Sequence, residues 1–214
     1  MAKLTNIELE ELQSYMKGKT IAVLGNGKCI LKNPNGKLID SHDVVIRMNG
    51  GAPVKSFSSG EFMGTKFDIY SVNQDAAHYV KRGKSAKYIL RLNPLGQNRL
   101  DAKQAQNLKL FPNIYYAFGK QQKQIKKLAT KPPYNKGNRD INKRPSTGAW
   151  TLEFLIRNID FKSISLFGFD FFKEFEKSKG RGNVFNSHLN QKHDPVAERE
   201  YFENIIKNYD ITLY

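Results

Sequence analysis

Short apolar segments alternate along the chain with stretches compatible with helices, and this pattern most limits the fold. Residues 21–24 are apolar throughout and run directly into Gly25-Asn26-Gly27-Lys28, which predicts a buried strand followed by a tight turn. Such alternation favours an α/β fold: a single Rossmann-like domain over residues 1–214, with a mostly parallel twisted sheet and helices on both faces. The further strands we expect lie at 44–46, 67–72, 88–92, 114–118 and 164–167.

Helix signals are clearest at the two ends of the chain. Asn6 is placed to cap a first helix that reaches about Met16, with apolar residues at helical spacing behind it. Near the C-terminus, Asp194 is a natural N-cap and Pro195 a natural first helical residue. We therefore expect helices at both places.

The charge of the chain indicates an anionic partner. The formal net charge is +15 and the isoelectric point about 9.8, so nucleic acid, anionic lipid headgroups or an anionic substrate are all candidates. Residues 120–144 hold many Lys and Arg against the single acid Asp140, with Pro132 and Pro133 interrupting any helix. We expect a mobile basic loop there, although a solvated loop that keeps the protein soluble explains most of these charges equally well.

Compartment signals favour the cytoplasm. No apolar run approaches the roughly 20 residues that a membrane span needs, and the N-terminal residues have no secretory signal core. The single cysteine, Cys29, excludes an internal disulfide. We expect a cytoplasmic protein with a peripheral contact to the anionic inner face of the membrane.

Two groups of polar residues follow predicted strands. Gly25, Asn26 and Gly27 offer backbone amides and a side-chain amide to a phosphate or ribose, but Ile30 breaks the full dinucleotide pattern G-x-G-x-x-G. Arg47 and Asn49 alternate onto one face of the next strand, so both are placed to reach a ligand. The alternative is that Arg47 only pairs with Asp40 or Asp43, which then serve as turn caps.

Two helix starts complete the candidate residues. Ser146 or Thr147 is a natural N-cap, and the free amides behind it form an anion site, while Gly148 in the first turn implies that something approaches the backbone closely. His193 precedes the last helix, where the dipole keeps the imidazole neutral and able to accept a proton, and Glu198 in the next turn is placed to orient it.

Several motifs are absent from the sequence. It has no Asp-x-Asp, no His-rich or Cys-rich metal spacing, no G-x-S-x-G elbow and no P-loop. We therefore predict neither a metal site nor a cofactor, and we do not expect a serine hydrolase or a kinase.

Taken in order, three segments resemble the motifs of the sialyltransferases of glycosyltransferase family 29. They are residues 21–27 running to 39–53, residues 144–148 through 168–169, and the H-x-x-x-x-E from His193 to Glu198. The resemblance implies a GT-A-like variant of the Rossmann-like fold and a CMP-sugar donor. It also implies that His193 is the general base supported by Glu198, and that the donor is bound by Gly25, Asn26, Asn49, Ser146, Thr147, Gly148 and His188.

The chain departs from the family pattern in four ways. The positions of the family's disulfide look like Ile21 and Asn158, the third residue of its Gly-Asn-Ser is Gly27, and the residues after His188 do not match. The membrane anchor and stem are also missing. The lack of an anchor and stem favours a bacterial, viral or otherwise truncated form.

The function expected from all this is transfer of sialic acid from CMP-sialic acid to a hydroxyl of a glycan or glycolipid, with inversion and without a metal. The nearest alternative is a CMP-Kdo transferase of the same fold. An alternative from another class is a nucleic-acid or polyanion-binding module in which Phe169, Phe171, Phe172 and Phe175 stack on bases, although a buried strand-to-helix junction explains them more simply. Nucleic acid is not the expected partner.

Overall fold

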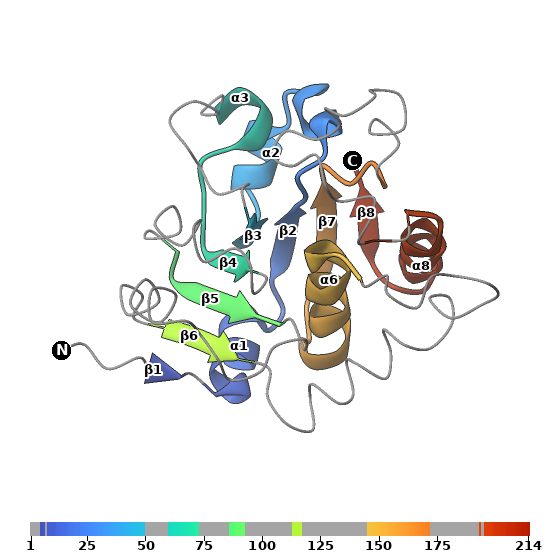
Figure 1. Cartoon of the computed structure of the whole chain (residues 1–214). Helices are drawn as coiled ribbons and strands as arrows, with labels where there is room; N and C mark the ends of the chain where they lie inside the picture. Colours follow the sequence, from blue (N-terminus) through green and yellow to red (C-terminus); the bar gives the residue numbers. More distant parts are fainter. Residues whose placement is uncertain are drawn as a thin grey trace, which may run out of the picture.

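One sheet of parallel strands forms the centre of the described protein (Figure 1). The computed structural model describes residues 5–6, 8–49, 60–72, 86–92, 113–116, 145–171, 193 and 195–214. In this part of the chain the sheet has 8 strands in the order β1-β6-β5-β4-β3-β2-β7-β8, and every neighbouring pair is parallel. The strands are β1 (Thr5–Asn6), β2 (Thr20–Leu24), β3 (Val44–Met48), β4 (Ile69–Val72), β5 (Tyr88–Arg91), β6 (Asn113–Tyr116), β7 (Ser163–Phe167) and β8 (Ile211–Leu213).

Helices cover both faces of the sheet because successive strand side chains point to opposite sides. Ile21 and Val23 pack into a core cluster with residues of α1 (Leu9–Met16), α6 (Thr147–Asn158) and α8 (Pro195–Asn208). Ala22 and Leu24 face the other side, where η1 (Lys28–Leu31), α2 (Gly36–Asp40) and α3 (Gly60–Met63) contribute Ile30, Ile39 and Met63. The expected α/β class with a parallel sheet is confirmed.

The strand order fixes where a ligand can enter. From β2 the chain steps through β3, β4, β5 and β6 to one side, whereas β7 and β8 lie on the other side of β2. The connections from β2 and β7 therefore leave in opposite directions, and parallel sheets bind ligands at the carboxyl ends of such strands. Gly25 N donates to Phe167 O at 2.7 Å, and a Cβ on Gly25 would lie 2.4 Å from Gly168 O. This close contact between the two strand ends excludes a side chain at position 25.

Several boundaries differ from the sequence-based expectation. Asn6 is not a helix cap: it pairs with Ile114 in the β1–β6 ladder, and Glu8 is the N-cap of α1 without a side-chain hydrogen bond. The strand β8 was not expected because three residues carry too little pattern. The basic loop predicted at 120–144 lies outside the described residues.

A polar cluster around the buried Arg47 joins β3 to the segment before β4. We call Asp40, Arg47, Thr65 and Lys66 the Asp40–Arg47 cluster. Arg47 is only 1% exposed, and its Nε and Nη2 donate to Lys66 O at 2.9 Å and to Met63 O at 2.8 Å. The Asp40 carboxylate accepts from the amides of Thr65 and Lys66 at 2.9 Å. These hydrogen bonds join β3 and the end of α2 to the segment before β4.

Two pKa values reflect this arrangement. Burial lowers the pKa of Arg47 to about 10, against the opposing charge of Asp40. Burial raises the pKa of Asp40, but the hydrogen bonds from the backbone of Lys66 and Thr65 outweigh that effect and hold it below its usual 3.8. Both groups are therefore charged at neutral pH.

None of the helices in the described residues has the length and apolar character needed to span a membrane.

Candidate active site

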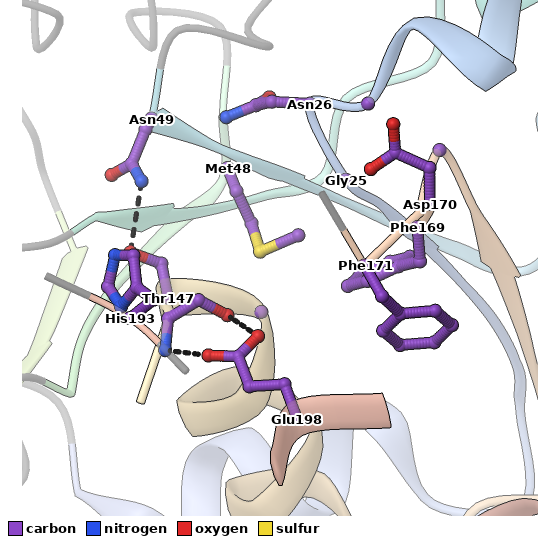
Figure 2. Close-up of a pocket in the computed structure, with 14 residues that line it drawn as sticks. Gly25, Asn26, Met48, Asn49, Thr147, Phe169, Asp170, Phe171, His193 and Glu198 are labelled. Atoms are coloured by element: carbon purple, nitrogen blue, oxygen red, sulfur yellow. Dashed lines mark hydrogen bonds between the residues drawn. The ribbon is translucent and has the colours of Figure 1, made fainter. Parts of the chain in front are cut away.

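A pocket lies at the carboxyl ends of β2, β3 and β7, the position that the strand order indicates (Figure 2). The first turns of α6 and α8 close it. Most of the residues predicted as a site line this pocket, although they come from distant parts of the sequence. The lining residues are Gly25, Asn26, Gly27, Met48, Asn49, Ser146, Thr147, Gly148, Gly168, Phe169, Asp170, Phe171, His193 and Glu198.

Asn49 enters the pocket through an unusual backbone conformation. Its φ is 45°, in the left-handed region that Asn tolerates better than most residues. The side-chain Nδ2 donates to Thr147 Oγ1 at 2.9 Å, and the Asn49 carbonyl accepts from the Tyr70 hydroxyl. Asn49 thus links the end of β3 to the start of α6.

The prediction that Arg47 shares this ligand-facing side was wrong. Regular alternation of side chains ends with the strand at Met48, and the left-handed residue that follows redirects the chain. Arg47 instead donates to the carbonyls of Met63 and Lys66 and does not line the pocket.

The N-terminus of α6 presents unused amides to the pocket. Ser146 is the N-cap, as predicted, and its Oγ accepts from Ala149 N at 3.2 Å. The amides of Thr147 and Gly148 make no hydrogen bond within the described part of the chain, and both residues line the pocket. Free amides in the first turn together with the helix dipole favour an anionic ligand.

Gly148 has a packing reason in addition to its place in the pocket. A Cβ at this position would lie 2.6 Å from Cε1 of Phe169. Phe169 in turn packs on Phe202, with ring centroids 5.2 Å apart, and Phe171 does the same at 5.2 Å. The close approach expected at Gly148 is therefore made by the protein's own ring, which also supports the junction interpretation of Phe169 and Phe171.

Glu198 ties α8 to α6. The carboxylate is 3% exposed and accepts from Ser146 N at 2.6 Å and from Ser146 Oγ at 2.9 Å (Figure 2). A negative charge at a helix N-terminus is stabilising, and here it also satisfies one of the orphan amides. The sequence-based role for Glu198 was support of His193, and that role stays a prediction, because the two hydrogen bonds described here join Glu198 to Ser146.

His193 stands just before α8, which begins at Pro195 as expected. The residue is 8% exposed and lines the pocket. Figure 2 shows it on the same side as Asn49 and Thr147. His188 and Asp194 lie outside the described residues, so the predicted phosphate contact of His188 stays a prediction.

Asn26 holds the clearest sign of a missing partner. Its Oδ1 is buried and has no hydrogen-bond partner among the residues that the structure describes. A buried acceptor without a donor costs free energy, so such atoms are rare in folded proteins unless a ligand or water completes them. A hydrogen-bond donor from a ligand or a water molecule beside Asn26 would satisfy this atom.

Sequence reasoning missed Asp170 as a pocket residue. It follows the end of β7 by three residues, just as Gly27 follows the end of β2. The rule that ligands bind at the carboxyl ends of parallel strands would have found it, had it been applied to 168–171 as it was to 25–27. Met48, Gly168, Phe169 and Phe171 were likewise not assigned to the pocket.

In the described residues no three His, Cys, Asp or Glu side chains come together in a way that would hold a metal ion. Metal independence stays a prediction, which chelation tests directly.

The model of glycosyltransferase family 29 (sialyltransferase) matches residues 2–94. This match supports the resemblance over the first of the three motifs, which includes Gly25, Asn26 and Asn49, whereas the motifs at 144–169 and 193–198 lie outside the matched residues. No comparison assigns a role to a single residue, so the predicted roles of the pocket residues stay predictions.

Solved structures share the fold. A sialyltransferase, CstII, from Campylobacter jejuni, described in complex with cytidine-5'-monophosphate, aligns with a TM-score of 0.58 at 19% identity, covering 92% of this chain and 79% of that one. A mammalian sialyltransferase in complex with Gal-beta-1-3GalNAc-ortho-nitrophenol aligns with a TM-score of 0.60 at 18% identity, covering 98% of this chain and 74% of that one.

Proposed function

We propose that this chain is a glycosyltransferase of the sialyltransferase type that transfers sialic acid from CMP-sialic acid to a hydroxyl of a glycan or glycolipid, with inversion and without a metal ion. The family match supports the reaction class. The similar C. jejuni sialyltransferase was solved in complex with cytidine-5'-monophosphate, which supports a CMP-sugar as the donor.

One observation carries the proposal. The free amides of Thr147 and Gly148 and the imidazole of His193 line the same pocket. One cavity therefore holds both hydrogen-bond donors for the phosphate of the sugar donor and a proton acceptor for the acceptor hydroxyl. An attack on an activated sugar requires both.

The proposed step is a direct displacement at the anomeric carbon. The bond from that carbon to the phosphate oxygen breaks and CMP leaves with the electron pair, while the acceptor oxygen forms the new bond from the opposite face. His193 takes the acceptor proton, and the α6 amides stabilise the charge of the departing phosphate. Glu198 acts as a positioning residue, because it fixes the start of α8 against α6.

The proposed reaction needs no metal ion because of the chemistry of the sugar donor. CMP-sialic acid has a single phosphate attached to the sugar, so there is no diphosphate to neutralise. A helix N-terminus offers donors for one phosphate without a cation. EDTA should therefore leave activity unchanged.

The first test is thermal melting with CMP, CMP-sialic acid, CMP-Kdo, UMP and GDP, each with EDTA present. At a ligand concentration of 100 Kd the stabilisation is about 2.7 kcal/mol, and for a chain of this size each kcal/mol raises Tm by about 2–4 °C. Shifts confined to cytidine ligands support the donor site. A shift with CMP-Kdo but none with CMP-sialic acid selects the alternative sugar, and equal shifts with GDP contradict the proposal.

The second test compares two buried histidines. His193→Ala should lower turnover by about 10²–10⁴ while CMP binding and Tm change little. His42 Nδ1 donates to Leu38 O and His42 Nε2 shares a hydrogen bond with Ser165 Oγ, both at 2.8 Å, and the residue does not line the pocket. His42→Ala should lower Tm yet leave turnover of the folded protein unchanged. If His193→Ala turns over substrate as fast as wild type, His193 is not the general base.

We also propose a peripheral contact with anionic membrane surfaces. The described residues carry about as many Asp and Glu as Lys and Arg, so nearly all of the net charge of +15 belongs to other segments. One of them, 117–144, follows the carboxyl end of β6, and strands end there on the same edge of the sheet as the pocket. A glycolipid acceptor would bring its own anionic surface to that edge.

Vesicle sedimentation tests this contact. The protein should bind vesicles with anionic lipid, release them as salt rises and ignore neutral vesicles. Lys126→Glu combined with Lys127→Glu should weaken binding, and Lys17→Glu with Lys207→Glu is the charge-matched control on the described frame. If both double variants lose vesicle binding equally, the net charge of the protein alone explains the binding. If the protein retains RNA in preference to vesicles, the nucleic-acid alternative is favoured.

A further inference from the structure

We infer that Tyr201 is a positioning residue for the proposed reaction. Its hydrogen bond to Glu153 fixes the orientation of α8, and His193 stands two residues before that helix begins. The inference rests on the proposed function, because Tyr201 acts only through the general base that this function requires. The contact uses a different pair of side chains from the one between Glu198 and Ser146.

The Glu153 carboxylate belongs to α6 and is divided between two donors. The residue is 9% exposed. Its Oε1 accepts from Nε of Arg157, one turn further along α6, and its Oε2 accepts from the Tyr201 hydroxyl of α8. Arg157 thus orients the carboxylate within α6 itself. The carboxylate therefore offers α8 one acceptor in a defined place.

The hydrogen bond of Tyr201 gives α8 a second point of attachment to α6. The first is Glu198, three residues earlier and so roughly 4.5 Å back along the helix axis. On α6 the partners are Ser146, the N-cap, and Glu153, about two turns later. A single contact would leave α8 able to pivot about Glu198, whereas two contacts at different heights fix both its rotation and its position along α6.

The helix α6 is the fixed member of this pair. Both helices pack on the same face of the sheet (Figure 1), and in α6 Leu152, Phe154 and Leu155 are at most 1% exposed in that core. The same helix carries the amides of Thr147 and Gly148 to the pocket. Holding α8 against α6 therefore holds His193 in a set relation to the amides proposed to bind the phosphate.

The polar pair contributes orientation more than stability. Bringing a carboxylate into a protein interior costs free energy that its partners largely offset, so an apolar pair of similar shape is often as stable. A hydrogen bond, unlike an apolar contact, also has a preferred direction. Replacing both Tyr201 and Glu153 by apolar side chains should therefore separate the two effects.

The experiment measures Tm, the Kd of CMP, and kcat and KM with CMP-sialic acid and the most active acceptor from a glycan screen. The proteins are wild type, Tyr201→Phe, Glu153→Leu and the double variant. Each single variant should lose stability because it leaves a polar group of its partner without a hydrogen bond, and the double variant should regain it. All three should lower kcat by about tenfold or more, since a displacement of about 1 Å can cost about 10²-fold.

The donor site should not respond to these changes. The Kd of CMP and the KM of CMP-sialic acid should stay as in wild type, because the amides proposed to bind the phosphate belong to α6 and not to α8. Tyr209→Phe alters an exposed tyrosine just after α8 and is the matched control, which should change none of the measured quantities.

The outcomes that overturn the inference differ from those that overturn the function. If the double variant recovers turnover together with Tm, the pair is structural only. If Tyr201→Phe matches an active wild type in turnover, Tyr201 does not position the base and the proposed function stands. Adding Tyr201→Phe to His193→Ala should lower kcat no further, and a further fall would mean that Tyr201 acts other than through His193. If wild type transfers nothing from CMP-sialic acid, the proposed function fails and the inference fails with it.

Discussion

Two polar clusters flank β3, and they differ in whether the protein satisfies them. In the Asp40–Arg47 cluster the guanidinium and the carboxylate have partners within the chain. In the pocket, the Oδ1 of Asn26 has none, and the amides of Thr147 and Gly148 are unused in the described residues. Both clusters contain Asp, Arg or Glu near buried backbone, so residue type alone does not separate them. The two clusters are distinguished by whether the polar groups have hydrogen-bond partners within the described chain.

The comparison predicts that the largest loss of stability comes from Arg47. Arg47→Met should lower the free energy of unfolding by about 3 kcal/mol, because the carbonyls of Met63 and Lys66 lose their donor. Urea titration measures this. Lys37→Met, on an exposed residue of α2, is the control and should change the value by under about 0.5 kcal/mol. A similar small change for Arg47→Met would mean that the cluster contributes nothing to stability.

Glu198 tests the part of the pocket that the protein does satisfy. Glu198→Ala should cost about 2 kcal/mol, since two hydrogen bonds to a buried carboxylate are lost at the start of α6. Turnover should fall as well, because α8 carries His193 to the pocket. Glu203→Ala, exposed on the same helix, should be neutral in both assays. If Glu198→Ala lowers turnover without lowering Tm, its role is in the chemistry and not in positioning.

The stability contributed by the Asp40–Arg47 cluster should depend on pH through Asp40. Its pKa is lower folded than unfolded, so the carboxylate stabilises the protein above 3.8, and this contribution is lost as the pH falls through the folded value. Asp40→Asn should cost about 1–2 kcal/mol at pH 7. The difference from wild type should shrink as the pH falls below 3.8. A difference that stays constant down to pH 2 would show that charge is not involved.

Asn26 should show the smallest effect on stability and a clear one on binding. Asn26→Ala removes an acceptor that has no donor in the free protein, so unfolding free energy should change by under about 0.5 kcal/mol or rise. CMP should bind at least about tenfold more weakly. Asn33→Ala, at an exposed position, leaves both quantities unchanged. A large loss of stability in Asn26→Ala would place it with the structural cluster.

The sequence predicted the features that depend on local pattern. Ser146 was expected as an N-cap because it precedes an apolar helical stretch, and the strand at 21–24 because it is apolar and ends in glycine. The site residues 25, 26, 49, 146–148, 193 and 198 were found through the family motifs, and all of them line one pocket. Their chemistry stays a prediction.

What the sequence did not predict depends on contacts between distant residues. Arg47 was placed on the ligand side because the alternation rule was extended past Met48, and nothing local reveals the left-handed conformation of Asn49. Asp170 was overlooked because its proximity to Gly27 arises only when β7 pairs with β2. Asn6 looked like a helix cap until its partner in β6, far along the chain, was known.

The central position of β2 has a consequence for synthesis of the protein. Ile21 pairs with Val44 on one side and with Ile164 on the other, so one edge of this apolar strand acquires its partner early and the other very late. While the ribosome makes the intervening residues, that edge offers unpaired backbone groups to any other nascent chain. The contact between Gly25 and Gly168, and with it the pocket, forms only once β7 has emerged. We expect the half-made chain to depend on chaperones and to lack any affinity for nucleotide until then.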